Sequence, residues 1–177
     1  TGSRKLFPEL VLLPCYEWDR IVLVPKDHAL AQRRQRLDLE TLASSPLVTY
    51  VFSLTGESSF KQAFAAKGLE SDVVFTARDA DIIKTYVRMG MGVGVIAAMA
   101  WECRDKTDLV ALNASRLLPR VTTWIGFKRD TVLRGYMVDF AKLFASHLSP
   151  ELTQQAASLE SQTDVDKLFE GVSLSLR

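Results

Sequence analysis

The sequence contains few of the residues that build metal centres and disulfide frameworks. Its 177 residues include two cysteines and two histidines. Cys15 and Cys103 are too few for a disulfide scaffold, and their separation is not that of metal ligands. His28 and His147 have no carboxylate or cysteine at a spacing that favours metal binding or general-base chemistry. We therefore expect no metal centre and no cofactor.

An excess of charge of either sign is also absent. Lysine and arginine total 22 against 21 aspartates and glutamates, so the net charge is +1. Because a nucleic-acid interface is normally basic, any contact with DNA is expected to lie outside this chain. No apolar run approaches the roughly 20 residues of a membrane span. The opening "TGSRKLFPEL" has neither a signal-peptide core nor an initiator methionine, which suggests a segment of a larger cytoplasmic protein.

Catalytic motifs are missing as well. The sequence has no P-loop, no G-x-S-x-G elbow and no evident pair of catalytic carboxylates. Gly90, Gly92 and Gly94 in "MGMGVGV" follow a predicted helix and enter a predicted strand. A dinucleotide-binding loop has the opposite order, so a tight helix-to-strand turn explains these glycines better. We expect a protein that is not an enzyme.

Strand-like and helix-like segments alternate along most of the chain. The predicted strands are 9–16, 20–25, 47–50, 72–77, the start of "GVGVIAAMAW", 108–113 and 122–129. The predicted helices lie near 39–43, 58–67, 79–90 and 133–148, and two more precede a fraying tail near 150–160 and 163–170. This alternation predicts an α/β domain with a mainly parallel sheet and helices on both faces. Ligands of such domains bind beyond the carboxyl ends of the strands.

One such strand end carries an unusual number of hydroxyl groups. In "LVTYVFSLTGESSF" (47–60) four hydroxyl residues surround Gly56 between a strand and a helix: Ser53, Thr55, Ser58 and Ser59. A local interpretation is helix capping by Thr55 or Ser58, worth about 1 kcal/mol. A functional interpretation is a site for a small oxyanion, held by N–H groups and hydroxyls without lysine or arginine. The pattern leaves both open. The turn "TARDAD" (76–81) is expected at the same edge.

Several segments together resemble the effector-binding domain of LysR-type transcriptional regulators, in the branch that contains CysB and Cbl. They are "LPCYEWDR", "HALA", "PLVTYVFSLTGESSFKQAF", "VVFTARDADIIKTYVRMGMGVGVIAAMA" and "TTWIGFKRDTVLRGYMVDFAKLFASHL". The resemblance implies an α/β fold of the periplasmic-binding-protein-like type II class, with one complete Rossmann-like lobe plus part of the second. Residues 15–120 would form the second effector-binding lobe, 1–14 and 121–148 part of the first, and 149–177 a C-terminal extension.

The same resemblance implies what this chain does not contain. A DNA-binding domain and the first half of the first lobe would be missing. The segments 122–129 and 133–148 carry apolar faces that should pack on that missing half. The full protein would be a cytoplasmic homotetramer that binds promoter DNA and regulates cysteine biosynthesis and sulfur assimilation. Its effectors would be acetylserine, sulfate or adenosine phosphosulfate, bound between the lobes.

The effector-binding residues follow from the resemblance position by position. Thr55 matches a threonine that contacts sulfate in the family, and Thr1 falls near a second such threonine. The predicted effector-binding set is Thr55, Gly56, Thr49, Thr1, Thr76 and Asp79. Two other interpretations remain: a periplasmic sulfate or oxyanion receptor of a transporter, which shares the fold, and an enzyme of sulfur metabolism.

Overall fold

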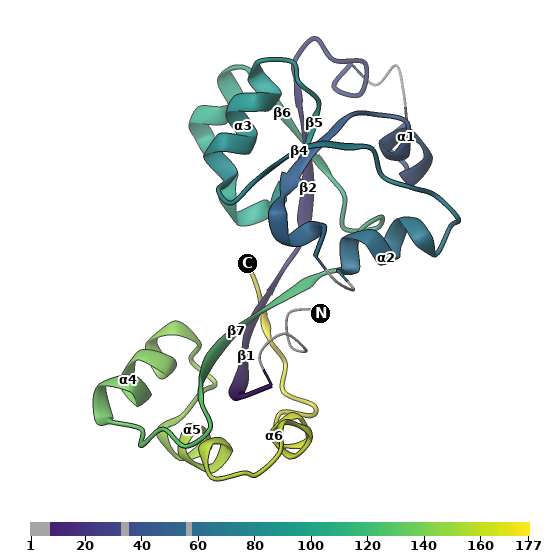
Figure 1. Ribbon diagram of the computed structural model, residues 1–177. Coiled ribbons are helices and arrows are strands. Elements are labelled where there is room, and N and C mark those ends of the chain that lie inside the picture. Colours follow the sequence, from purple (N-terminus) through teal and green to yellow (C-terminus); the bar gives the residue numbers. More distant parts are fainter. Residues whose placement is uncertain (1–7, 33–35, 56–57) are drawn as a thin grey trace. The chain divides into compact units, whose positions relative to one another are not determined.

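The computed structural model describes residues 8–32, 36–55 and 58–177, and the chain divides into two compact units (Figure 1). Unit 1 comprises Trp18–Val121, and unit 2 comprises residues 8–17 together with Thr122–Arg177. The chain therefore passes from unit 2 into unit 1 and back. These crossings lie near the boundaries expected from the sequence, while the assignment of each part to a lobe or a C-terminal extension stays a prediction.

Unit 1 is built on a five-stranded mixed sheet with the order β4-β3-β5-β2-β6. Strand β3 (Leu47–Tyr50) is parallel to β4 (Val73–Ala77) and β5 (Val93–Ala97). Strand β2 (Arg20–Pro25) is antiparallel to β5 and to β6 (Leu109–Asn113). The expectation of a mainly parallel sheet was therefore only half correct. Helical crossovers make β3, β4 and β5 parallel, whereas β2 enters directly from β1 and runs the opposite way.

Helices cover both faces of this sheet, as the alternating pattern predicted. They are α1 (Leu39–Ala43), α2 (Ser59–Ala65) and α3 (Ala80–Arg88). Figure 1 shows α3 on one side of the strands and α1 and α2 on the other. Strand β2 alternates accordingly, because Val22 and Val24 pack with Phe60 and Phe64 whereas Leu23 packs with Ile83. Both faces are thus closed by apolar cores.

The glycines between α3 and β5 serve the helix-to-strand turn that the sequence predicted. Gly90 follows α3 with φ of 74°, a conformation that residues with a Cβ rarely adopt. A Cβ atom on Gly94 would lie 2.7 Å from Cγ2 of Val87 and 3.2 Å from Cβ of Leu23. The absence of a side chain at Gly94 therefore lets α3 pack closely on the sheet.

Unit 2 contains a three-stranded sheet with the order β7-β1-β8. Its strands are β1 (Leu10–Trp18), β7 (Val121–Lys128) and β8 (Ser175–Leu176), and the last is parallel to β1. The expectation that the tail would fray was wrong at this point. The Arg177 backbone N–H donates to the Glu17 carbonyl at 2.8 Å, and the guanidinium lies 4.4 Å from the Tyr16 ring centre. Such pairing cannot be predicted from a two-residue segment.

Three helices complete unit 2. They are α4 (Gly135–Phe144), α5 (Pro150–Ala157) and α6 (Gln162–Leu168). The side chains of Ser149 and Ser161 accept from backbone N–H groups and cap α5 and α6. Helix α4 is shorter than predicted because the backbone turns extended at Ala145. Among the helices of the described ranges, none combines the length and the hydropathy that a membrane crossing requires.

Candidate functional site

The predicted site residues that the structure describes gather at one edge of the unit 1 sheet. Strands β3, β4 and β5 end at this edge and β2 begins there. The register sets Thr49 opposite Thr76 and Tyr50 opposite Ala77. The carboxyl ends of parallel strands are where α/β domains hold their ligands. The sheet therefore brings the loops after β3 and β4 together, as expected.

The hydroxyl-rich turn after β3 satisfies several of its own hydrogen bonds. The Ser58 hydroxyl oxygen accepts from the Lys61 backbone N–H at 3.2 Å, so Ser58 caps α2. The same hydroxyl donates to the Ser53 carbonyl. The exposed Thr55 hydroxyl donates to the Phe52 carbonyl at 3.0 Å. The capping interpretation is thus confirmed for Ser58, whereas Thr55 is no cap and presents its side chain outward.

Thr49 has a different position from Thr55. Its side chain is fully buried, and its hydroxyl donates to the Val95 carbonyl at 3.0 Å. A hydroxyl has one proton, so the Thr49 oxygen accepts from the Ser53 hydroxyl, 3.2 Å away. These bonds tie β3 to β5 and to the turn. The Thr49 side chain therefore fixes the position of the turn from inside the core.

The remaining predicted residues lie in the second loop or outside the described ranges. Thr76 is half-buried on β4, one of the two edge strands of the sheet. The exposed Asp79 accepts from the Asp81 backbone N–H at 2.6 Å and caps α3. Gly56 and Thr1 fall outside the residues that the structure describes.

Tyr50 links the turn to the neighbouring strand. Its hydroxyl accepts from the Ala97 backbone N–H at 3.2 Å. Its ring stacks on that of Phe52 with centroids 4.8 Å apart. Burial raises the pKa of Tyr50 above its ordinary value, so the phenol stays protonated at neutral pH. The turn is therefore held by an aromatic pair as well as by its hydroxyls.

Arg20, which the sequence analysis did not select, lies at the same edge. Its side chain is 3% exposed. The guanidinium donates to the Pro119 carbonyl at 2.7 Å and to the Ser59 hydroxyl at 3.2 Å, and it lies 5.6 Å from the Trp18 ring centre. Burial lowers the pKa of Arg20 to about 10, which leaves it charged at neutral pH. The available signal was an arginine at the head of the apolar strand "RIVLVP".

The edge therefore combines hydroxyl groups, a buried guanidinium and an aspartate that caps a helix. This chemistry suits reversible binding of a small anionic or strongly polar molecule. Within the described ranges, no cluster of three or more histidine, cysteine, aspartate or glutamate side chains could hold a metal ion.

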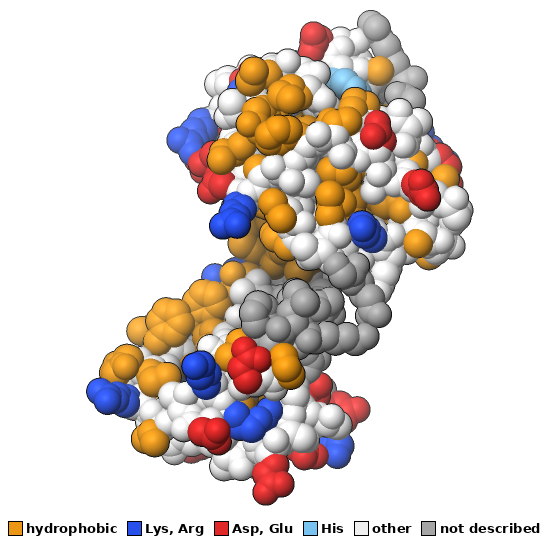
Figure 2. Space-filling view, viewed as in Figure 1, with side chains coloured by type: hydrophobic (Ala, Val, Ile, Leu, Met, Phe, Trp, Pro, Cys, Tyr) orange, Lys and Arg blue, Asp and Glu red, His pale blue; other side chains and the backbone are white. Residues whose placement is uncertain are grey.

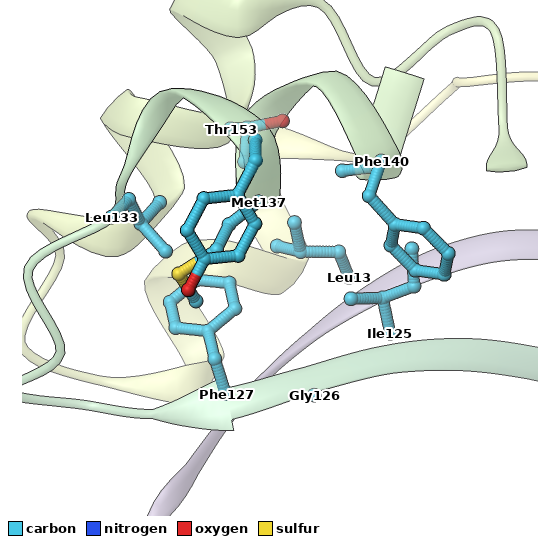
Figure 3. Close-up of a pocket in the computed structure, with 10 residues that line it drawn as sticks. Leu13, Ile125, Gly126, Phe127, Leu133, Met137, Phe140 and Thr153 are labelled. Carbon is cyan, nitrogen blue, oxygen red and sulfur yellow. The ribbon is translucent and has the colours of Figure 1, made fainter. Parts of the chain in front are cut away.

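Unit 2 contains a cavity of a different character (Figure 3). It has a volume of about 530 Å³ and lies among β1, β7, α4 and α5. Its lining includes Leu13, Ile125, Phe127 and Met137 and has no charged side chain. The hydroxyl of Thr153, also in the lining, is buried without a hydrogen-bond partner among the described residues. Such a surface does not suit a small anion, because it offers no compensation for the lost hydration.

The outer surface beside this cavity is apolar too. Tyr136, Phe140 and Leu143 of α4 are 68%, 57% and 86% exposed. Figure 2 shows hydrophobic side chains gathered over β7 and α4. The apolar faces predicted for these two segments are therefore confirmed, while the segment expected to cover them stays a prediction.

Comparison with known proteins shows a consistent set of relatives. The family model described as "LysR substrate binding domain" matches residues 1–149. The chain is 46% identical over 177 residues to the HTH-type transcriptional regulator CysB of Haemophilus influenzae, covering 100% of this chain and 54% of that protein. It is 46% identical over 149 residues to the HTH-type transcriptional regulator SsuR of Burkholderia cenocepacia, covering 84% of this chain and 48% of that protein.

The crystal structure of the cofactor-binding domain of the Cbl transcriptional regulator has a similar fold. It superposes with a TM-score of 0.77 at 38% identity, covering 86% of this chain and 67% of that one. The present chain thus spans about half the length of the regulators it matches.

Proposed function

Because this chain belongs to the LysR substrate-binding domain family, we propose that it is the ligand-sensing part of a regulator of cysteine biosynthesis or sulfur assimilation. The resemblance to LysR-type effector-binding domains, drawn from the sequence, is confirmed, and so is the periplasmic-binding-protein-like α/β fold. The relatives reported above are transcriptional regulators, which does not favour the alternative of a periplasmic transport receptor. The sensing role itself is the proposal.

The observation that carries the proposal is the convergence of two polar loops at one sheet edge. Thr76 on β4 lies opposite Thr49 on β3. Strand β3 leads into the turn that presents the Thr55 hydroxyl. We assign to this edge an effector of the acetylserine, sulfate or adenosine phosphosulfate type. The proposed binding residues are Thr55, Thr76 and Asp79, together with Gly56 and Thr1 from outside the described ranges, and the buried Thr49 of the predicted set supports them.

The contacts suggest different roles for these residues. The Thr55 hydroxyl can rotate from the Phe52 carbonyl to an anion, exchanging one exposed hydrogen bond for a charge-assisted one. Thr49 holds the turn in place through its bonds to Val95 and Ser53. The exposed carboxylate of Asp79 would repel sulfate and suits the amino group of an amino-acid effector.

In the proposed mechanism the effector acts by differential affinity. An effector that binds one arrangement of the protein more tightly shifts the population toward that arrangement. The linked change would pass through a cytoplasmic homotetramer to a DNA-binding domain outside this chain, and so to promoter DNA. The mechanism needs no cofactor and no catalytic step.

A pair of threonine variants tests the site. Thr55→Val should weaken sulfate and acetylserine binding by about tenfold in calorimetric titration, because one hydrogen bond to a charged group is lost. Thr85→Val is the matched control, since Thr85 is also exposed and also donates to a backbone carbonyl, that of Asp81, at 2.8 Å. Unchanged affinity in Thr55→Val would remove Thr55 from the site.

A further inference from the structure

Among the described residues of unit 1, the buried cations Lys84 and Arg20 have very different surroundings. Lys84 is 1% exposed and Arg20 is 3% exposed. The Lys84 ammonium lies 2.8 Å from a carboxylate oxygen of Asp105 and 3.3 Å from one of Asp81. In the described parts of the chain, the Arg20 guanidinium has no carboxylate within 4.0 Å. Its hydrogen-bond acceptors, Pro119 and Ser59, are both neutral.

A buried charge without a counter-charge is strongly unfavourable. Neutral acceptors and the Trp18 ring replace only part of the lost hydration of Arg20. A guanidinium has five N–H donors in a planar fork, and its two hydrogen bonds to described residues leave donors for a further acceptor. An oxyanion fits this fork because it can accept two parallel hydrogen bonds. Arg20 therefore has the properties of a cation whose counter-charge is supplied by a bound anion.

The position of Arg20 connects it to the proposed site. It is the first residue of β2 and lies opposite Ala97, the last residue of β5. The Ala97 backbone N–H is the donor to the Tyr50 hydroxyl at the end of β3. Ser59, which accepts from Arg20, directly follows the residue that caps α2 and closes the hydroxyl-rich turn. The guanidinium thus contacts the first residue of α2, the helix that follows the turn carrying Thr55.

We propose that Arg20 is the counter-charge of the effector and binds its oxyanion group, either free sulfate or the carboxylate or phosphosulfate of an organic effector. This inference rests on the proposed effector site. It replaces the sequence-based expectation that the anion is held without lysine or arginine. The Ser59 hydroxyl, now an acceptor from Arg20, is released to donate to the incoming anion.

A purely structural role predicts a different behaviour. If Arg20 only tied β2 to Pro119 and Ser59, its removal would destabilise the protein equally with and without ligand. If it is an unpaired charge awaiting an anion, Arg20→Gln should keep the ligand-free melting temperature within about 3 °C of the wild type. The rise in melting temperature that sulfate produces should then be lost.

The experiment titrates the wild type and three variants with sulfate, acetylserine and the methyl ester of acetylserine. We expect sulfate binding to weaken about 30-fold in Arg20→Gln and about tenfold in Arg20→Lys, which keeps the charge but loses the fork. Arg116→Gln, which removes an exposed arginine of the same unit, should leave all affinities unchanged. Weakening for sulfate alone indicates an inorganic anion as the partner of Arg20. Weakening for acetylserine but not for its ester indicates the carboxylate.

The outcomes separate the two proposals. A folded wild type that binds none of the three compounds, and does not bind adenosine phosphosulfate either, overturns the effector site itself. If Thr55→Val weakens binding and Arg20→Gln binds like the wild type, only the role of Arg20 is overturned. A destabilised ligand-free Arg20→Gln with the full sulfate-induced rise assigns Arg20 to structure. If Arg20→Gln does not fold, that also counts against the proposal, and unchanged sulfate affinity in Arg20→Lys completes the refutation.

Discussion

The two units of this chain differ in how their aromatic side chains pack. In unit 1, an apolar core lies on each face of the sheet, and Phe60, Phe64 and Ile83 are at most 1% exposed, although Val74 and Phe75 of the edge strand β4 are 47% and 37% exposed. In unit 2, Phe140 and Leu143 remain 57% and 86% exposed beside an apolar cavity. Unit 1 therefore has the attributes of an independently stable domain. In unit 2, the strands and helices are formed, but the described residues leave the apolar face of α4 uncovered.

The largest test of this contrast compares one phenylalanine in each unit. Phe60→Ala should lower the free energy of unfolding by about 3–5 kcal/mol, because it leaves a cavity in a closed core. Phe140→Ala should cost less than about 1 kcal/mol, because its ring is already largely in water. Differential scanning calorimetry on both variants measures the difference. Equal losses would show that the α4 face is buried in solution.

Acid should lower the stability of unit 1 through the buried carboxylate of Asp105. Although burial opposes it, hydrogen bonds from Lys84 and Arg88 lower the pKa of Asp105 from 3.8 to about 2. Because the pKa of Asp105 is lower in the folded than in the unfolded protein, this carboxylate stabilises the fold at pH values above its unfolded pKa of 3.8. The stabilisation is lost as the pH falls from about 4 to 2. The expected loss is about 2 kcal/mol from this group.

Calorimetry between pH 6 and pH 2 measures this loss. Asp105→Asn should be less stable than the wild type at pH 6, because Lys84 loses its partner at 2.8 Å. The difference between the two proteins should shrink as the pH approaches 2. Asp139→Asn, at an exposed position of α4, is the control. A constant difference across this range would contradict the role of Asp105.

A smaller effect distinguishes two buried threonines. Thr49→Val in unit 1 should cost about 1–2 kcal/mol, because the Val95 carbonyl and the Ser53 hydroxyl lose a partner. Thr153→Val in unit 2 should be neutral or stabilise by up to about 1 kcal/mol, since the Thr153 hydroxyl has no partner among the described residues. Urea unfolding of the two nearly isosteric variants should then show a loss of stability for Thr49→Val and none for Thr153→Val. A loss in Thr153→Val would mean that its hydroxyl is bonded in solution.

Much of the secondary structure could be predicted from local pattern. Strand β3 and helix α1 have the predicted bounds, since the short, fully buried run "LVTY" and the capping Asp38 act within a few residues. The direction of β2 and the pairing of β8 could not be predicted, because both depend on strands distant in sequence. The same limit applies to the site. The sequence pointed to the loops after β3 and β4, but it did not identify Arg20, whose burial depends on Pro119 and Ser59.

The sequence by itself determined the α/β class, the helix-to-strand turn at Gly90 and the resemblance to LysR-type effector-binding domains. These features follow from residue types at short spacing, where backbone and side-chain preferences act directly. Only the tertiary structure decided which polar groups have partners. It buried the Thr49 hydroxyl against Val95, gave Lys84 a carboxylate and left Arg20, among the described residues, with neutral acceptors. The reason is that partnership depends on distance in space, which residues separated by dozens of positions acquire only on folding.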